Sequence, residues 1–290
     1  MASTQSRSLT AIIDHRVRSN DFRLPVFNPI ALKLQRLLGT DTDIGTIECL
    51  IHKDAALATE ILRVANSPFF AGLAPSESIR DALVRLGFEQ VTSIAMMAAQ
   101  QQAFRAKDPF LGDVMKRLWL HSMVSAIGCR WLAGKSGHGK RRETAFLCGL
   151  LHDLGNLVIL RVLEEVQRTM DGNPLTESVL VELIEALHAN YGVMMMSSWG
   201  LPEILVEVAR DHHQPFDRSQ DPLTLIVRIV DATCARLNIG LQEGDPIEPA
   251  SLEEVALLGL GDAELAALEL LLEDTARGAG GDELGGCSAS

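Results

Sequence analysis

Apolar side chains recur along most of the chain at the three-to-four residue spacing of a helix that buries one face. Two clear runs extend from Ala55 to Ala65 and from Ile79 to Leu86. Gly87 follows the second run, and a glycine in that position readily ends a helix. Alternating runs that would predict β-strands are nearly absent. The pattern therefore predicts an all-α protein.

Further stretches of the same periodicity predict helices over 28–38, 43–52, 89–103, 111–134, 142–153, 155–168, 176–188, 191–198, 202–213, 221–237 and 263–272. The periodicity lapses near Phe104, and a turn-rich segment follows Asn238. From these breaks we expect an N-terminal extension (1–20), an N-terminal helical lobe (21–106), a helical core (107–240), a helical coda (241–275) and a disordered Gly/Ser-rich tail (276–290).

The bulk composition narrows the class of protein. With 290 residues, 47% of them hydrophobic, the chain can form one large domain or two modest ones with real cores. Its net charge of -12 argues against a nucleic-acid partner held mainly by phosphate neutralisation. The basic stretch 135–142 could form a local positive face, although a solvated loop between helices has the same composition. We do not expect a nucleic-acid partner.

Cysteine usage and hydropathy indicate the compartment. No CxxC pairing occurs among Cys49, Cys129, Cys148, Cys234 and Cys287. An odd count with apolar neighbours predicts reduced thiols in a cytoplasmic protein. The N-terminus has no apolar signal-type segment, and nowhere do eighteen apolar residues run together. We therefore expect neither secretion nor a membrane partner.

A set of histidines and aspartates carries the most distinctive chemistry: His121, His152, Asp153, His188, His212, His213 and Asp231. The adjacent pair His152-Asp153 can offer a metal one neutral nitrogen and one anionic oxygen. Asp231 lies within an apolar helix face, where a carboxylate needs a partner or a metal. Because the set includes no cysteine, iron, manganese or zinc would suit it better than a thiolate-selected ion.

Several of these residues also have a purely structural interpretation. His121 follows an apolar segment and could be a hydrogen-bonded core histidine. His188 could be a packing or surface residue. His212 and His213 resemble a helix C-terminus, where a protonated imidazole interacts favourably with the helix dipole.

Five segments together resemble the HDOD family, which comprises helical domains related to HD phosphohydrolases and found in bacterial signalling proteins. They are Leu24-Pro25, the run 54–67, the run 78–87, the segment 149–155 and the segment 199–202. The resemblance extends over about residues 21–237. It implies an HD-like helical core that carries an N-terminal helical lobe.

The same resemblance implies roles for the histidines and aspartates. The minimal ligand set of HD phosphohydrolases would correspond here to His121, His152, Asp153 and Asp231. Histidines at 188, 212 and 213 resemble the additional ligands of HD-GYP phosphodiesterases, which implies a second divalent ion. Asp153, together with a metal-bound hydroxide, is then the candidate catalytic residue.

Three features depart from the catalytic pattern of HD-GYP enzymes. Asn156 stands where those enzymes carry a phosphate-contacting lysine, and Arg117 stands where larger sites can place a glutamate ligand. No GYP-type segment follows. Moreover, the HDOD family is usually regarded as non-catalytic or of unproven activity.

We therefore interpret the chain as a cytoplasmic bacterial signal-transduction protein, a regulatory module with a retained divalent metal site. Its partner would be a signalling protein, a nucleotide-type small ligand, or both. One alternative is an active metal-dependent phosphohydrolase that acts on a nucleotide or cyclic nucleotide. Another is a protein that binds a nucleotide without cleaving it.

Overall fold

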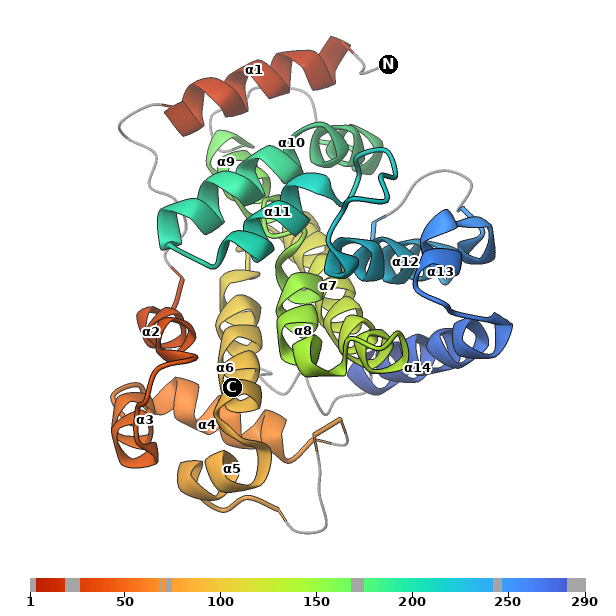
Figure 1. Ribbon diagram of the computed structural model, residues 1–290. Helices are drawn as coiled ribbons and strands as arrows, with labels where there is room; N and C mark the ends of the chain where they lie inside the picture. The colour runs from red at the N-terminus through yellow and green to blue at the C-terminus, as the bar shows by residue number, and fades with distance from the viewer. Residues whose placement is uncertain are drawn as a thin grey trace. The chain divides into compact units, whose positions relative to one another are not determined.

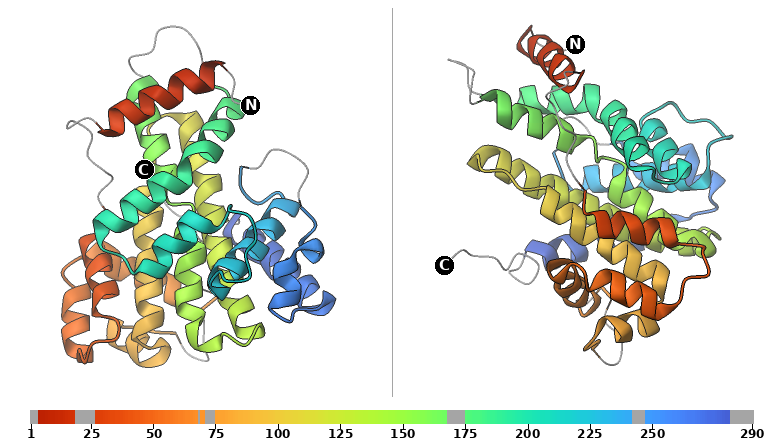
Figure 2. Two further views of the ribbon diagram at one scale, coloured as in Figure 1. Left: turned by 45° about the horizontal axis from the view of Figure 1, so that its top comes forward. Right: turned by 90° about the vertical axis from the view of Figure 1, so that its left-hand side faces the viewer.

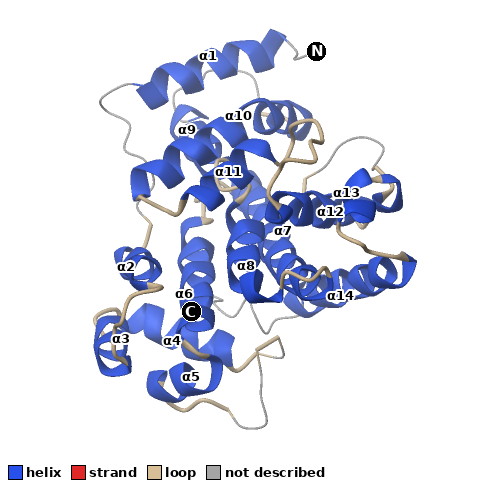
Figure 3. Cartoon of the chain, in the orientation of Figure 1, coloured by secondary structure: helices blue, strands red, loops and turns tan. Residues whose placement is uncertain are grey.

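Every regular element is a helix in the part of the chain that the computed structural model describes (Figure 3). That part comprises residues 4–18, 27–67, 69–70, 75–167, 175–241 and 247–280. The predicted all-α class is confirmed. The segment Leu24-Pro25 and residues 281–290 of the predicted tail lie outside the described residues.

The chain folds into two units, of which residues 25–105 form one. Its described helices are α2 (Pro29–Leu37), α3 (Ile44–Ile51), α4 (Ala55–Ala65), α5 (Ile79–Leu86) and α6 (Phe88–Ala103). The start of α5 follows from its sequence: Ser78 accepts a hydrogen bond from the Asp81 backbone, and the Asp81 side chain accepts one from the Ser78 backbone. This capping box satisfies two backbone donors that the first turn leaves free.

The second unit comprises the described residues within 1–24 and 106–290. Its helices are α1 (Thr4–Arg18), α7 (Pro109–Lys135), η1 (Gly139–Arg141), α8 (Arg142–Leu151), α9 (Asn156–Gln167), α10 (Glu177–Trp199), α11 (Glu203–Asp211), α12 (Pro222–Arg236), η2 (Pro249–Ser251), α13 (Glu253–Leu257) and α14 (Asp262–Gly280). Helix α7 is the centre of this unit, because it packs against α8, α12 and α14 (Figure 1).

Helix α1 was not expected from the sequence, which gave no element within residues 1–20. It packs along α10 and α9 (Figure 2). Leu9 and Ile13 are buried there, and Asp14 accepts a hydrogen bond of 2.6 Å from the Tyr191 hydroxyl. Only two of the described side chains of this helix, four residues apart, are fully buried, and such a short stripe is a weak helical pattern, which explains why it was overlooked.

Helix α10 is continuous, whereas the sequence predicted two helices over 176–188 and 191–198. The predicted break at Asn190 fails because no proline interrupts the backbone and Asn190 itself points to solvent. The helix ends instead at Gly200, whose φ of 66° is left-handed. Helix α14 also extends beyond the predicted 263–272 and takes in residues 276–280, which were expected to be disordered.

Two described segments, Gly139–Val166 and Glu177–Trp199, are long and apolar enough to cross a membrane. Inside the protein, however, 89% of the apolar window of the first and 61% of that of the second are buried. Core helices of soluble proteins pass the same length and composition test, so these segments are weak indications of a membrane span.

A very close backbone contact joins the turn after α8 to α10. A Cβ atom on Gly155 would lie 1.8 Å from the carbonyl oxygen of His188 and 2.6 Å from the backbone nitrogen of Gly192. Only a residue without a side chain fits there. Gly155 therefore sets the distance between the His152-Asp153 turn and the helix that carries His188.

Replacing this glycine tests that constraint. We expect Gly155→Ala to lower the free energy of unfolding by about 2 kcal/mol or more, because the added methyl group forces α10 away from the turn. Gly134→Ala is the matched control, since Gly134 is exposed in α7 with nothing within 4 Å of its would-be Cβ. The control should leave stability unchanged or raise it by about 0.5–1 kcal/mol. Thermal and urea denaturation measure both, and equal stabilities would contradict the constraint.

Candidate metal centre

The structure brings together all seven histidines and aspartates that the sequence singled out. They arrive from different parts of the second unit: His121 from the middle of α7, His152 and Asp153 from the turn after α8, His188 from α10, His212 and His213 from the end of α11, and Asp231 from α12. They form two clusters, in each of which the potential ligand atoms lie within 4.8 Å of one another.

The first cluster consists of His121, His152 and Asp231. The Nε2 atoms of the two imidazoles are 3.3 Å apart. An Asp231 oxygen lies 3.4 Å from Nε2 of His121 and 4.0 Å from Nε2 of His152. Both imidazoles are buried, so this cluster lies deep in the unit.

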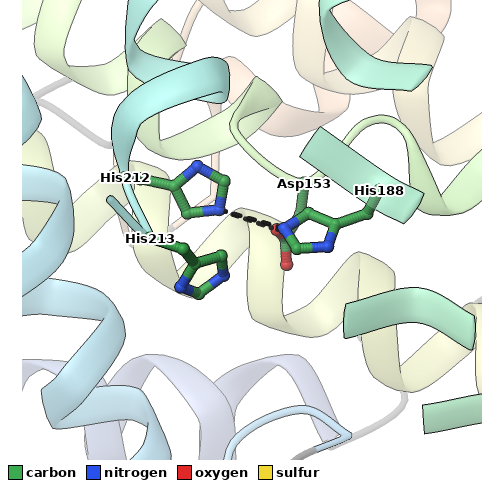
Figure 4. Close-up of side chains that lie close together, drawn as sticks. All are labelled: Asp153, His188, His212 and His213. Atoms are coloured by element: carbon green, nitrogen blue, oxygen red, sulfur yellow. Dashed lines mark hydrogen bonds and ion pairs between the residues drawn. The ribbon is translucent and has the colours of Figure 1, made fainter. Parts of the chain in front are cut away.

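The second cluster consists of His188, His212 and His213, together with Asp153 (Figure 4). The Nε2 atoms of His188 and His212 are 3.2 Å apart. The His213 ring lies beside them, with its centroid 4.1 Å from that of His212. His213 is exposed, whereas His188 and His212 are buried, so this cluster is the one nearer to solvent.

The carboxylate of Asp153 connects the two clusters. One oxygen, Oδ2, lies 3.6 Å from Nε2 of His121 and 3.7 Å from Nε2 of His152. The other, Oδ1, lies 3.5 Å from Nε2 of both His188 and His212. A single carboxylate therefore offers one oxygen to each cluster.

Backbone carbonyls fix the orientation of the four buried imidazoles. In each ring Nδ1 faces a carbonyl oxygen: His121 that of Ile239 at 3.1 Å, His152 that of Gly149 at 2.9 Å, His188 that of Ile184 at 2.6 Å, and His212 that of Ala209 at 3.0 Å. A carbonyl oxygen can only accept a hydrogen bond, so each Nδ1 carries the proton. In the neutral ring Nε2 then presents a lone pair, as in most metal-binding histidines.

These distances and tautomers fit metal ions well. Neighbouring ligands on an ion about 2.1 Å away are separated by roughly 3.0–3.4 Å at octahedral or tetrahedral angles. Most ligand-atom separations in both clusters lie near that range, from 3.2 to 3.7 Å. Facing Nε2 lone pairs also repel each other unless a cation or a proton lies between them. The donor set of imidazoles and carboxylates suits iron, manganese or zinc.

The two aspartates remain ionised inside the protein. Burial opposes their charge, but neighbouring imidazoles outweigh it. His152 and His212 hold the pKa of Asp153 well below its usual range, and His121 does the same for Asp231. The centre therefore carries two negative charges, which two divalent ions would overcompensate.

The histidines divide into two groups by pKa. Burial lowers the pKa of His152 and of His213 to about 4. Burial also acts on His121 and His212, but bonding to an aspartate outweighs it and raises the pKa of both rings: Asp231 acts on His121, and Asp153 on His212. In the metal-free centre, protons therefore compete with a metal ion more strongly for His121 and His212 than for His152 and His213.

A cavity of about 380 Å³ opens onto both clusters and is large enough for a small ligand. Several residues that line the cavity were not expected there from the sequence, among them Glu185, Arg228, Asn238 and the coda residues Ile247 and Leu252. Arg228 could have been found, since a charged residue between Val227 and Ile229 on an apolar helix needs a partner just as Asp231 does.

Asn156 and Arg117, the two departures noted in the sequence, behave differently. Asn156 lines the cavity and is 1% exposed, and neither its amide nitrogen nor its amide oxygen has a hydrogen-bond partner among the described residues. Arg117 donates to Glu177 and to the carbonyl of Gly240, whose backbone lies against the His121 ring. Arg117 therefore supports His121, while Asn156 is free to bond a ligand.

Comparison with known proteins identifies the family. A model of the HDOD domain matches residues 24–215, so the chain belongs to the HDOD domain family. An uncharacterised protein of Treponema pallidum (strain Nichols) is 24% identical over 216 residues. The match covers 72% of this chain but only 40% of that protein, so the chain spans well under half the length of this relative.

Solved structures share the fold. An HDOD domain protein of unknown function from Geobacter sulfurreducens superposes with a TM-score of 0.74 at 21% identity, over 96% of this chain and 98% of that one. A proposed metal-dependent phosphohydrolase from Shewanella amazonensis SB2B gives 0.73 at 21% identity, over 94% and 100%. A proposed signal transduction protein from Marinobacter aquaeolei VT8 gives 0.69 at 22% identity, over 97% and 66%.

Removing the shared carboxylate tests the centre. We expect wild-type protein, purified without a His-tag or chelator, to bind two equivalents of iron, manganese or zinc, because each cluster offers a separate set of ligands. Asp153→Ala should retain fewer than one, since both clusters lose an anionic oxygen. Asp113→Ala on the exposed face of α7 is the control and should match the wild type. Elemental analysis measures all three, and an Asp153→Ala protein with full metal content would refute the assignment.

Metal binding should also release protons. The raised pKa values of His121 and His212 mean that these rings keep a second proton to higher pH than a free imidazole does, and an ion must displace that proton. Affinity should therefore rise as the pH increases from 6 through the raised pKa values. Calorimetric titrations in buffers of different ionisation enthalpy report the number of protons released. A value of zero at pH 7 would show that both rings are already neutral.

Proposed function

We propose that this protein is a metal-dependent phosphohydrolase that acts on a phosphodiester of the nucleotide or cyclic-nucleotide class. One observation carries the proposal: Asp153 lies between the two histidine clusters and turns one oxygen toward each. A carboxylate in that position suits two divalent metal ions, and sites with two metal ions are common in enzymes that cleave phosphate esters. The proposed hydrolase role of a structural neighbour from Shewanella amazonensis agrees with it.

The residues of the chain would share the work as follows. When bound, a pair of divalent ions would polarise the phosphoryl oxygens and make a water molecule more acidic. The imidazoles keep Nε2 free for this purpose, because backbone carbonyls hold Nδ1. Leu118 and Ile184 line the cavity beside the clusters and limit the access of further water.

The charge around the cavity favours a substrate with few negative charges. Among the described residues that line it, Arg228 is the only lysine or arginine, and its guanidinium is already bonded to Glu254 and to backbone carbonyls. Neutralisation of the phosphate would therefore fall to the ions. A phosphodiester, with one charge per phosphate, suits this arrangement better than a polyphosphate chain does.

Asn156 would provide the polar recognition. A buried amide without a partner costs about 1–3 kcal/mol, which a hydrogen-bonding ligand would recover. Its position, three residues after Asp153, brings it to the same cavity. A neutral amide can donate to a phosphate oxygen or bond a base or sugar, but it cannot add charge as a lysine would.

A signalling module is the second candidate, and the separate unit of residues 25–105 favours it. That unit supplies none of the seven residues of the centre, although it accounts for a large part of the family match. A unit without metal-binding residues suits a separate role, such as contact with a signalling protein, with the metal centre as the sensing part. The proposed signalling role of the Marinobacter aquaeolei neighbour agrees with this alternative.

We also propose a cytoplasmic location. Cys129, Cys148 and Cys234 are buried free thiols, and Cys49 is an exposed one. Burial raises the pKa of the Cys129 and Cys148 thiols, which makes them inert rather than redox-active. Free thiols of this kind suit a reducing compartment.

Hydrolysis by the metal-loaded protein tests the first candidate. We expect manganese-loaded wild type to cleave bis(p-nitrophenyl) phosphate or a member of a panel of cyclic nucleotides, and Asp153→Ala to lose this activity. Asn156→Leu should raise KM while the metal content stays unchanged, because the substitution removes a ligand-bonding amide and no metal ligand. Release of p-nitrophenolate from the first substrate, and chromatography of the linear nucleotides formed from the others, measure turnover.

The same panel separates the alternatives. Thermal stabilisation by a nucleotide without product would indicate a binding protein. If protein that holds two ions shows no stabilisation and no turnover, the signalling module is favoured. A search for its protein partner would then follow.

A further inference from the structure

The C-terminal part of the chain, beyond residue 215, lies outside the family match and yet forms one wall of the centre. Helix α12 supplies Asp231, and the coda residues Ile247 and Leu252 line the cavity. The coda packs onto the rest of the unit through α13 against α12 and α14 against α7. An ion pair between α12 and α13 lies at this wall.

Arg228 on α12 forms that ion pair and also contacts the second cluster. Its Nε donates to Oε1 of Glu254 at 2.6 Å. Its Nη1 donates to the carbonyl oxygen of His212 at 3.0 Å and to that of Gln214. One guanidinium therefore ties the coda to the backbone that carries His212 and His213.

Both side chains of the Arg228–Glu254 ion pair are largely removed from solvent. Glu254 is 1% exposed, and its side chain touches Arg228 at the start of α13. The Arg228 side chain is 17% exposed. A buried carboxylate left without its partner is strongly unfavourable, so the pair holds its position firmly. The planar guanidinium can serve a carboxylate and two carbonyls at once, which a lysine could not do with the same geometry.

The turn that Arg228 holds lies at the C-terminal end of α11. Helix α11 ends at Asp211, and the residues from His212 to Gln214 leave the helix with their carbonyls free of helical partners. His212 places Nε2 in the second cluster, and its neighbour His213 contributes the most exposed imidazole. A shift of this turn would move two potential ligands together.

We propose that Arg228, held by Glu254, is a positioning residue for the second cluster, so that the coda controls binding of the second ion and leaves the first unaffected. Neither residue contacts His121 or His152 among the described interactions. The inference rests on the proposed two-ion centre. If Arg228 has this role, the coda, which lies outside the family match, contributes to metal binding.

Manganese binding tests the proposal through stoichiometry and spectroscopy. Wild type should bind two equivalents and show the exchange-coupled electron paramagnetic resonance spectrum of a bridged pair. Arg228→Met should weaken the second equivalent by about 10- to 100-fold, as loss of a residue that orients a ligand does. At one equivalent retained, its spectrum should be the six-line signal of isolated manganese. General destabilisation of the protein would weaken binding of both ions. It would not change the spectrum while the affinity for the first ion stays the same.

Two further variants keep the result decisive. Arg228→Met with Glu254→Leu removes both charges and leaves an apolar contact, a replacement that commonly preserves or raises stability. It should fold and still lose the second ion. Glu269→Gln is the matched control. Glu269 pairs with Arg236, so this substitution breaks another ion pair between α12 and the coda, away from the cavity. It should bind two ions as tightly as the wild type.

The outcomes separate this inference from the proposal on which it rests. Two equivalents in the wild type and in both Arg228 variants, with equal affinities, would overturn the role of Arg228 alone. Fewer than two in the wild type would overturn the two-ion centre and this inference with it. Equal losses in the Glu269→Gln control would overturn the inference too, since they would reflect general loosening of the coda.

Discussion

The placement of one carboxylate determines the rest of this structure. Asp153 is a charged group within the protein, and it keeps its charge because imidazoles approach it from both sides. Those rings come from α7, the end of α8, α10 and the end of α11, so four elements must meet at one point. The helices are consequently arranged around a polar centre that their apolar faces enclose.

Two devices hold the elements at that point. Backbone carbonyls fix the rotation of the four buried imidazoles, so that their Nε2 atoms converge on the centre. The contact between Gly155 and the backbone of His188 fixes how closely α10 approaches the turn. Main-chain atoms take part in both devices, which fixes the positions of the ligand atoms more precisely than contacts between side chains alone would.

Much of this arrangement follows from the sequence. The helical class and most helices could be predicted from apolar periodicity, and the seven polar residues could be singled out because two aspartates and five histidines recur beside apolar segments. The sequence could not show that Asp153 turns one oxygen to each cluster, which depends on packing between distant helices. It also gave no sign of the Arg228–Glu254 contact, because the two residues are 26 positions apart and belong to different helices.

Two helices differ from the sequence-based prediction because the local pattern of residues was ambiguous. Helix α1 was overlooked because two buried residues make a weak stripe, and α10 was divided at Asn190 because a polar residue in mid-helix resembled a boundary. Tertiary packing decides both cases. In α10 the buried residues on either side of Asn190, Leu187 and Tyr191, keep the helix continuous.

The way the centre joins distant segments has a consequence for chain entropy. His121 and Asp231 meet in one cluster although about 110 residues separate them along the chain. An ion held between them would close a loop of that size, and a second ion would close another between α10 and α11. In this respect the centre would act as a disulfide does in a secreted protein, but reversibly: a chelator could open the cross-link, and the metal supply would set how often the chain is held closed.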